Sequence, residues 1–596
     1  MHMFLHKSVL NPLFHYSMFL CCFNIIKGYP QIHTGRWVGV KKLLTVFIVF
    51  SLVLSVFAFV VNTGSNVYAS EKKMVELFIG KKKVLINGSE SREIDVAPVI
   101  TNNRTFVPLR FVSEVLGAKV DWNADEQKVI ITQGSKIIEL WPITAKSQGK
   151  DVIRIDGKER KMDVKPYVDK KAGRTLVPVR FVSEALGFSV RWDAQAYRVI
   201  ISNFSLDIKA NTEVSGEIVI WHGWGTDSTE AEILDEIIAK FQEMYPYVTV
   251  DQVSVPFNDL KNKLTMAIPQ GQGPDLFIGP HDWVGELADY YKVIEPIDNY
   301  IDPLKLRAYF VPVTLQADTY KSHLWALPES FESVALIVNK DLVNSVPKTT
   351  DDLLNAKKFV KDGVQPLMFP VGTFYFYAPF HFGFGGGIFA YKNGKLTVDP
   401  IKNEGAIAAM NYLLALKKNG VLPSDPPDYG MMMDNFTKGK VAMIINGPWA
   451  WGDIKKKVPN ASIELIPGGK PFVGVKNIYL SSESQNKEAA IEFMKFFTGL
   501  VSADDGYSAP YRLAKEVGHI PALVDLYMKS DIRNSEVIRG FSSQASLGVP
   551  MPNIPEMGSV WSEMDNALQL VYSGQQTPQQ ALQTAYEKIM AAINKH

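Results

Sequence analysis

A stretch of 29 residues occurs twice in this chain, and the repeat limits how residues 72–204 can fold. Arg104–Thr132 and Arg174–Ser202 lie 70 residues apart and are identical at 17 of 29 positions. Identity of this extent at a fixed spacing indicates two copies of one structural unit. We therefore expect a tandem module over 72–204, with the same secondary structure in both copies.

Each copy has the pattern of a small α+β unit. Pro108 and Pro178 each end a strand and open a short helix. Gly117 and Gly187 are placed to end those helices. A strand pair should follow, beginning near the tryptophan of each copy, and the leading strands should be joined by tight turns. The residues that carry these two predictions are Trp122, Trp192, Asn87-Gly88 and Asp156-Gly157.

The module resembles the copper amine oxidase N-terminal-like domain, which is common as tandem copies in exported proteins of Gram-positive bacteria. This resemblance implies a stalk or a module that binds the cell envelope. Residues 71–220 contain neither His nor Cys, so the usual copper ligands are missing and we expect no metal. A spacer without any partner remains an open alternative.

The region before the module has the pattern of an export signal. Lys41 and Lys42 precede an apolar run over 43–61, and Val67-Tyr68-Ala69 has the small residues of a cleavage site. Residues 41–69 are therefore interpreted as a signal peptide or, because the run is long enough to cross a bilayer, a membrane anchor. Residues 1–40 are interpreted as an extension, most of which would be absent if translation starts at Val38 or Val40. We expect an extracellular protein that stays associated with the cell envelope.

Composition narrows the classes of partner and of chemistry. The chain has 63 basic and 62 acidic residues, a net charge of +1, which gives no electrostatic reason to expect nucleic acid. Both cysteines, Cys21 and Cys22, precede the export segment, so no disulfide or thiol nucleophile is expected after it. The 596 residues are too many for a single core, so several domains are expected.

Residues 205–215 are interpreted as a linker, and residues 216–596 as a second, larger domain. Its beginning alternates between apolar strands at 216–221 and 248–250 and helical periodicity at 230–244 and 257–268. Strands alternating with helices predict a parallel α/β lobe. Such lobes bind ligands at the carboxyl ends of their strands.

Several longer motifs follow along this domain: Gly273-Pro274-Asp275, His281-Asp282, 336–342, 438–451, 470–475 and 551–557. In these motifs and in their order, the domain resembles the bacterial family 1 extracellular solute-binding proteins. The resemblance implies a two-lobed periplasmic-binding-protein fold of type II, with a hinged cleft, behind the small α+β module. Chain crossings between the lobes are expected near 329–334, 471–476 and 533–537.

The resemblance also implies which side chains touch a sugar. Pyranose rings present apolar C–H faces that stack on aromatic rings, and hydroxyls that need hydrogen-bond partners. Trp449 and Trp561 should be stacking platforms, with tyrosines beside them and carboxylates accepting from hydroxyls. The remaining residues implied for the ligand are Tyr375, Tyr429, Glu332, Asp282 and, at the cleft wall, Met551.

Several positions depart from the family pattern. Gly279 replaces a tryptophan and Trp283 replaces an arginine, while the loop after the first strand is longer and contains Trp224. We expect Trp224 and Trp283 to supply the stacking that Gly279 cannot. Asp565 and Thr373 replace two further polar residues of the family site. Core roles for the tryptophans, and helix capping by Asp282, remain alternatives.

The resemblance to the solute-binding proteins implies a binding receptor of a sugar importer that is driven by a separate ATPase. No phosphate-binding loop, zinc-protease motif or nucleophile elbow occurs in the chain, so we expect no catalytic residue, metal or cofactor. The expected partners are a maltodextrin-like or cyclodextrin-like oligosaccharide, membrane permease subunits and the cell wall, and the chain is expected to be a monomer. A glycosidase and a wall-attached structural protein are the alternatives.

Overall fold

The computed structural model describes residues 72–226, 228–503 and 505–595. The extension at 1–40 and the signal peptide or anchor expected at 41–69 lie outside these residues. Within the described part, no helix combines the length and apolar character needed to cross a membrane.

The two copies of the module have the predicted elements in the predicted order. Helix α3 (Leu109–Val115) follows Pro108, and helix α4 (Val179–Leu186) follows Pro178. The proline ring holds φ near −65° at both positions, which directs the chain from strand into helix. Gly187 then adopts the left-handed conformation, with φ of 78°, and ends α4.

The copies exchange strands with each other. Strand β1 (Met74–Phe78), from the first copy, pairs antiparallel with β14 (Arg198–Ser202) of the second. Strand β8 (Lys136–Leu140), which opens the second copy, pairs with β7 (Lys128–Gln133) of the first. Each five-stranded sheet of the module therefore contains strands from both copies. The other strands are β2 (Lys83–Ile86), β3 (Glu90–Glu93), β4 (Val99–Thr101), β5 (Arg104–Pro108), β6 (Lys119–Asn123), β9 (Val152–Ile155), β10 (Lys158–Lys161), β11 (Tyr167–Asp169), β12 (Arg174–Pro178) and β13 (Ser189–Asp193).

The turns between leading strands have the backbone geometry that the sequence predicts. Asn87 and Gly88 have φ of 49° and 77°, and Asp156 and Gly157 have φ of 48° and 81°. Two successive positive φ angles define the tight hairpin turn that matches the twist of antiparallel strands. The Asn-Gly and Asp-Gly pairs tolerate these angles at little energetic cost.

The first lobe of the larger domain is built on a sheet in the order β16-β15-β17-β27-β20-β28, with β29 beside β27. Strand β15 (Gly216–His222) pairs parallel with β16 (Val248–Ser254) and with β17 (Leu276–Pro280), as the alternating pattern predicts. Leu276 and Ile278 pack into the core that contains helix α5 (Thr229–Met244). The other elements are α6 (Phe257–Ala267), α7 (Pro303–Leu306), α8 (Pro312–Ala317), β18 (Thr319–Tyr320), β19 (His323–Leu324), β20 (Ala326–Glu332), β27 (Phe472–Leu480), α14 (Lys487–Phe497), α15 (Ala509–Glu516), β28 (Ile520–Pro521), α16 (Ser530–Asn534) and β29 (Val549–Pro550).

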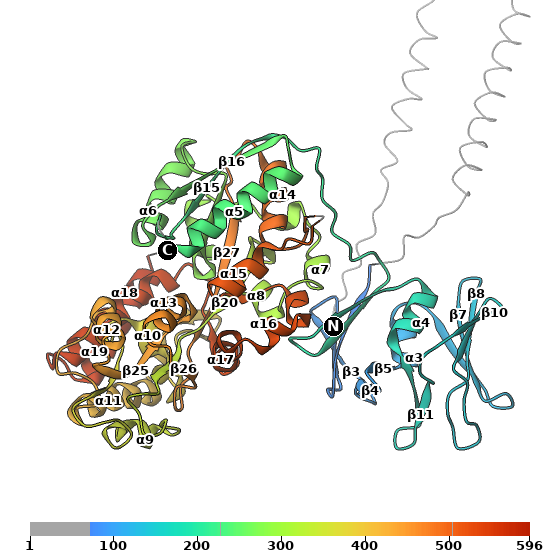
Figure 1. The fold of residues 1–596 in the computed structure, drawn as a ribbon, viewed down its shortest axis with the longest axis horizontal. Helices are drawn as coiled ribbons and strands as arrows, with labels where there is room; N and C mark the ends of the chain where they lie inside the picture. Colours follow the sequence, from blue (N-terminus) through green and yellow to red (C-terminus); the bar gives the residue numbers. More distant parts are fainter. Residues whose placement is uncertain (1–71, 227, 504, 596) are drawn as a thin grey trace, which may run out of the picture. The chain divides into compact units, whose positions relative to one another are not determined.

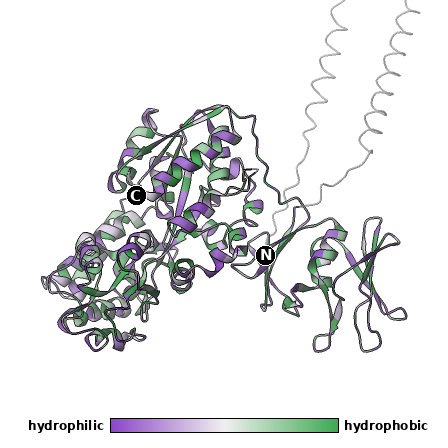
Figure 2. Ribbon diagram, in the orientation of Figure 1, coloured by the Kyte–Doolittle hydropathy of each residue, from purple (hydrophilic) through white to green (hydrophobic). Residues whose placement is uncertain are grey.

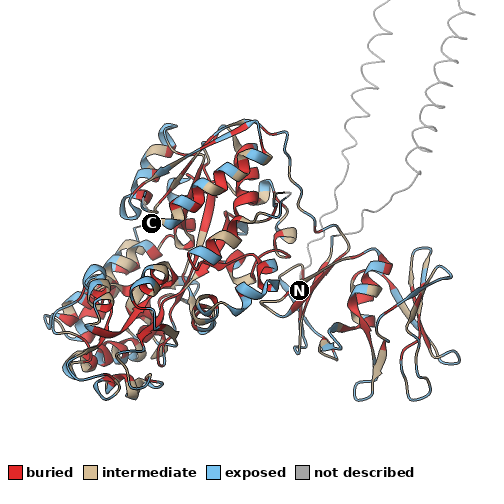
Figure 3. Ribbon diagram, in the orientation of Figure 1, coloured by how far each residue is buried: buried red, intermediate tan, exposed pale blue. Residues whose placement is uncertain are grey.

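Helices cover both faces of this sheet (Figure 1). Phe277 points away from the α5 side and packs with Leu260 and Leu264 of α6 in a separate apolar cluster. Because neighbouring residues of a strand face opposite sides, β17 is apolar at every position from Leu276 to Ile278. Figure 3 shows buried residues on these strands and on the inner faces of the helices.

The second lobe has a four-stranded sheet in the order β22-β25-β21-β26. Strand β25 (Val441–Asn446) is buried at every position, and helices pack around the sheet (Figure 2). The other elements are β21 (Ala335–Asn339), α9 (Thr350–Leu354), β22 (Gln365–Met368), α10 (Phe374–Gly383), β23 (Ala390–Lys392), β24 (Lys395–Thr397), α11 (Glu404–Lys418), α12 (Tyr429–Thr437), α13 (Trp451–Lys457), β26 (Ala461–Glu464), α17 (Glu536–Ala545), α18 (Met557–Tyr572) and α19 (Pro578–Ile593).

The chain passes between the lobes at short segments. Strand β20 belongs to the first sheet and β21 to the second, and only Ser333 and Val334 separate them. Strands β26 and β27 lie in different sheets in the same way, with the chain returning between Glu464 and Phe472. The passages therefore consist of Ser333 and Val334 and of residues 465–471.

Contacts also join the module to the first lobe. Residues 72–596 belong to one compact unit, and Arg198 of β14 is fully buried in it. Its guanidinium donates to the carboxylates of Glu76 and Asp193 and, through Nη2, to the carbonyl oxygens of Arg307 (2.8 Å) and Phe310 (3.0 Å). The side chain therefore connects both ends of the module to the first lobe through a paired, buried charge.

Candidate ligand-binding site

Three of the aromatic side chains predicted to stack on a ligand come together in the second lobe. Tyr375 lies in the first turn of α10, Trp449 in the 3-10 turn Pro448–Ala450 after β25, and Trp561 in the second turn of α18. The Tyr375 ring centroid is 6.2 Å from that of Trp449 and 6.5 Å from that of Trp561. Both tryptophans are only partly buried, so part of each indole remains accessible.

Tyr429 belongs to the same group. Its hydroxyl oxygen accepts from Nε1 of Trp449 at 3.1 Å. Asp428 caps α12 by accepting from the backbone N–H of Met431 at 2.7 Å, which fixes Tyr429 at the first position of the helix. The bond to Tyr429 orients the indole of Trp449, as expected for a pre-positioned stacking surface.

Asp282 reaches this cluster from the first lobe. One of its carboxylate oxygens accepts from Nε1 of Trp561 at 3.1 Å, so a side chain of each lobe contributes to the bond. Burial raises the pKa of Asp282 above its ordinary value, and the neighbouring His281 and Lys261 oppose this shift. The 3-10 turn here begins at His281, one residue before Asp282, which therefore does not cap it.

Glu332 and Met551 lie together at the end of β20 and after β29. A Cβ atom placed on Gly474 would lie 3.3 Å from Cε of Met551 and 3.5 Å from Cγ of Glu332. The glycine thus allows both side chains to approach strand β27. The backbone oxygen of Met551 accepts from Nε2 of the buried His281 at 2.9 Å, whose Nδ1 accepts from the backbone N–H of Val475, in the tautomer that these contacts require.

The Tyr375 hydroxyl is influenced by the charges of Glu332 and Asp282. It is buried, and it makes no hydrogen bond within the described part of the chain. Burial raises the pKa of Tyr375, and the carboxylates of Glu332 and then Asp282 add to the rise. Seven predicted residues therefore gather where the two lobes meet: Asp282, Glu332, Tyr375, Tyr429, Trp449, Met551 and Trp561.

The two replacement tryptophans lie elsewhere in the first lobe. The ring of Trp283 is 8% exposed and covers Gly279, whose Cβ, if present, would be 2.8 Å from it. Trp283 therefore fills the space of the missing side chain from inside the lobe. Trp224 packs beside His222 and His519, with the ammonium of Lys476 at 5.8 Å from its ring centroid.

Sequence reasoning did not single out three further aromatic residues near these positions. Phe472 lies 5.3 Å from Trp561 and stacks on Tyr375, and Phe376 lies 6.5 Å from Trp449, measured between ring centroids. Phe257 stacks on Trp283 with an interplanar angle of 26° and is 54% exposed. The accessible ring beside Trp283 is therefore that of Phe257. The sequence signal that could have identified Phe257 is its place directly after Pro256, at the start of a helix.

Asp565, noted only as a departure from the family pattern, lies one turn after Trp561 on α18. Its Oδ1 accepts from the backbone N–H of Phe374 at 2.6 Å, which satisfies a free donor at the start of α10. Burial raises the pKa of Asp565 from 3.8 to about 6. Asp565 thus holds α10, and with it Tyr375, against α18.

The arrangement offers aromatic faces and carboxylate acceptors to a ligand. Within the described residues, no group of three or more His, Cys, Asp or Glu side chains is arranged to hold a metal ion. Such a surface can bind a ligand with apolar faces and many hydroxyls through stacking and hydrogen bonds.

Comparison with known proteins identifies both parts of the chain. Residues 225–500 match the family model of the bacterial extracellular solute-binding proteins. Residues 60–142 and 149–218 match the model of the copper amine oxidase N-terminal domain. The fold and the two resemblances expected from the sequence are confirmed.

Curated relatives cover the larger domain. The maltotriose-binding protein of Pyrococcus abyssi is 32% identical over 368 residues, which are 59% of this chain and 77% of that protein. A maltooligosaccharide ABC transporter solute-binding lipoprotein of Streptococcus pneumoniae is 28% identical over 356 residues, 56% of this chain and 80% of that protein.

A solved structure agrees with these relatives. The crystal structure of a cyclo/maltodextrin-binding protein complexed with maltotetraose is 33% identical, with a TM-score of 0.55, and covers 63% of this chain and 97% of that one. The relatives and the structural neighbour are binding proteins. This chain therefore belongs to the bacterial extracellular solute-binding proteins, as a binding protein and not an enzyme, and carries a tandem copper amine oxidase N-terminal domain before its solute-binding part.

Proposed function

We propose that this protein is the receptor of an ABC sugar importer and binds a maltodextrin-like or cyclodextrin-like oligosaccharide between its two lobes. Trp449 and Trp561 stack on pyranose rings, and Asp282 and Glu332 accept from sugar hydroxyls. The Tyr375 hydroxyl completes the set as a donor. Phe257 and Trp224 extend the sugar-binding surface onto the first lobe.

One observation carries this proposal: aromatic rings of the second lobe meet a carboxylate of the first at the bond from Trp561 to Asp282. A ligand placed there touches both lobes. Its contacts can therefore favour a closed arrangement over an open one, which is how a hinged receptor responds to its ligand. The names of the relatives, which bind maltotriose and maltooligosaccharides, support an α-glucan as the ligand.

The remaining steps follow from a receptor of this kind. The occupied protein passes its sugar to membrane permease subunits, and a separate ATPase supplies the energy. We also propose export through the segment at 41–69, an extracellular monomeric receptor, and contact of the N-terminal module with the cell envelope. The module's contribution would be to hold the receptor near the membrane.

Calorimetric titration tests the proposed ligand. Maltotriose, maltotetraose, a cyclodextrin, a xylo-oligosaccharide and a galacto-oligosaccharide would be compared on the purified protein. Trp449→Ala and Trp561→Ala should each weaken α-glucan binding by at least about tenfold, because each removes a central stacking surface. The control is Tyr391→Ala, whose ring is 75% exposed on β23, outside the cluster. Unchanged affinity in both tryptophan variants would remove this assignment of the site.

A further inference from the structure

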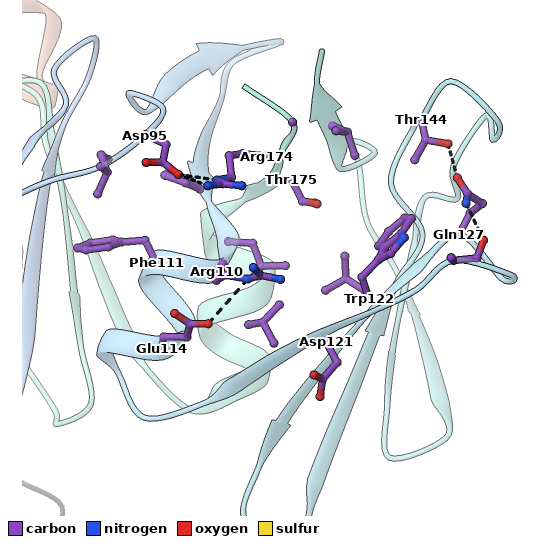
Figure 4. Close-up of a pocket in the computed structure, with 18 of the residues that line it drawn as sticks. Asp95, Arg110, Phe111, Glu114, Asp121, Trp122, Gln127, Thr144, Arg174 and Thr175 are labelled. Atoms are coloured by element: carbon purple, nitrogen blue, oxygen red, sulfur yellow. Dashed lines mark hydrogen bonds and ion pairs between the residues drawn. The ribbon is translucent and has the colours of Figure 1, made fainter. Parts of the chain in front are cut away.

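The N-terminal module has a cavity of its own, of about 690 Å³. Figure 4 shows Arg110 and Glu114, on α3, on one side and Trp122 and Gln127, from the β6–β7 hairpin, on the other. Arg174, on β12 of the second copy, also lines it, so both copies contribute to the cavity. Its volume lies in the range of about 300–1,000 Å³ that small-ligand sites occupy.

An aromatic face and paired charges line this cavity together. Trp122 is 41% exposed, which is unusual for the largest side chain in a folded protein. The Arg174 Nε atom donates to Asp95 at 2.5 Å, and Arg110 lies 3.8 Å from Glu114. Both pairs are about half exposed, so their outer donor and acceptor atoms remain free for a ligand.

The charges indicate what kind of ligand fits. Three basic and four acidic side chains line the cavity, so the formal net charge of its lining is −1. A phosphate-rich polymer would meet no excess of positive charge there. An indole face beside carboxylate and guanidinium groups instead matches a neutral sugar, which stacks its C–H face and bonds through its hydroxyls.

The second copy carries a different neighbour beside the corresponding tryptophan. Trp192 corresponds to Trp122 in the repeat, and Tyr197 corresponds to Gln127. The Tyr197 ring lies edge-on to Trp192, with centroids 6.2 Å apart, and Trp192 is correspondingly less exposed. The backbone is the same in both copies, with φ of 51° at Gln127 and 50° at Tyr197. Trp192 also packs against the core of the module, so the indole of Trp122 differs both in its neighbour and in its packing.

We propose that this cavity is a second binding site, for a neutral oligosaccharide, with Trp122 as its stacking surface. The sugar could come from the glycan of the cell wall or from the α-glucan bound between the lobes. A wall glycan as the source depends on the envelope role that we propose for the module. The argument that the cavity fits a neutral sugar does not depend on that role.

The test uses the complete protein carrying Trp449→Ala and Trp561→Ala, so that binding between the lobes is weakened. Tetra-N-acetylchitotetraose, which represents the wall glycan, and maltotetraose are titrated separately. Trp122→Ala and, as a matched variant, Gln127→Tyr are added to this background. Gln127→Tyr copies the second repeat, keeps Trp122, and suits the positive φ that a tyrosine already adopts at position 197.

At least one of the two sugars should bind in this background, and both added substitutions should reduce its affinity by about tenfold or more. The melting temperature should stay within a few degrees for Gln127→Tyr, which shows that the module is intact. Chitotetraose binding identifies the wall as the source, and maltotetraose binding identifies the transported sugar. No binding of either sugar at millimolar concentration, or binding unaffected by both substitutions, would overturn the proposal while leaving the site between the lobes untouched.

Discussion

Tyr375 carries a buried hydroxyl that makes no hydrogen bond within the described residues. Leaving such a group unpaired costs free energy comparable to a lost hydrogen bond, so proteins keep this arrangement where a ligand or a water completes it. The carboxylates of Glu332 and Asp282 act on this hydroxyl and help to raise its pKa, so it stays a neutral donor at physiological pH. A sugar hydroxyl is the acceptor that the proposed function supplies.

Tyr375→Phe should therefore weaken oligosaccharide binding without destabilising the protein. The loss should be about three- to tenfold, the value of one neutral hydrogen bond of roughly 0.5–1.5 kcal/mol. Calorimetric titration measures the affinity and thermal unfolding measures stability. Phenylalanine keeps the ring contacts with Trp449 and Trp561, so an equal affinity in both proteins would show that the hydroxyl does not touch the ligand.

Single residues of the site were predictable where a motif fixes both residue type and neighbours. Trp449 follows Gly-Pro after a buried strand, and Trp561 follows a Met-Pro-Asn-Ile-Pro segment, so the sequence motifs indicated that these two rings lie near one another. Trp283 shows the limit of this reasoning. Its ring turns inward because Gly279 leaves room for it, and a sequence does not reveal which of two rings, Trp283 or Phe257, is left exposed.

At the scale of elements, helix α18 organises the site. Trp561 and Asp565 lie one turn apart, so they share a face of the helix. Trp561 bonds to the first lobe, and Asp565 accepts from the N-terminus of α10, where a negative charge also suits the helix dipole. Burial nevertheless raises the pKa of Asp565 to about 6, which means that desolvation outweighs this favourable interaction.

Asp565→Asn should make the protein more stable at neutral pH but not in acid. Because the native pKa of about 6 exceeds the ordinary 3.8, the native state holds the proton more tightly, and wild-type stability falls as pH rises between these values. Asparagine can still accept from the N–H of Phe374 but carries no charge. Thermal unfolding from about pH 3.5 to pH 7.5 should show a growing advantage of the variant through this window.

Asp362→Asn, at an exposed position of the second lobe, is the control and should show no such trend. A constant difference between Asp565→Asn and wild type at all pH values would contradict the account of Asp565.

The elements of the module could be predicted, but not their pairing. Proline before a helix, glycine after it and Asn-Gly at a turn act over a few residues, so the repeat revealed them directly. The pairing of β1 with β14 joins Met74 to Ser202, residues far apart in the chain. Local patterns carry no information about which copy supplies a neighbouring strand, because both copies offer nearly identical edges.

For the whole molecule, Arg198 provides a fully buried contact between the module and the first lobe. The side chain is fully buried, and so are the two carboxylates with which it pairs, Glu76 and Asp193. Burying a charge in this way stabilises a structure only while every partner is present. The sequence predicted a linker at 205–215 but gave no sign of this contact, since lysine occupies the equivalent position, Lys128, in the first copy.

Arg198→Ala should lower the free energy of unfolding by about 3–5 kcal/mol, because it leaves the buried carboxylate of Asp193 without its cation and leaves Glu76 paired with Arg307 alone. Chemical denaturation measures the change. The matched control is Arg104→Ala, which removes an exposed ion pair with Asp163 and should cost at most about 1 kcal/mol. Equal losses in the two variants would show that the junction contributes no more than a surface contact.

The central claim is that an oligosaccharide lies between the lobes. Aromatic rings of the second lobe and the carboxylates of Asp282 and Glu332 hold it there. A crystal structure of the protein with maltotetraose tests this most directly. The account predicts glucose rings stacked on Trp449 and Trp561, with sugar hydroxyls within hydrogen-bond distance of Asp282, Glu332 and Tyr375. Sugar bound away from these side chains, with the indoles of Trp449 and Trp561 uncovered, would contradict it.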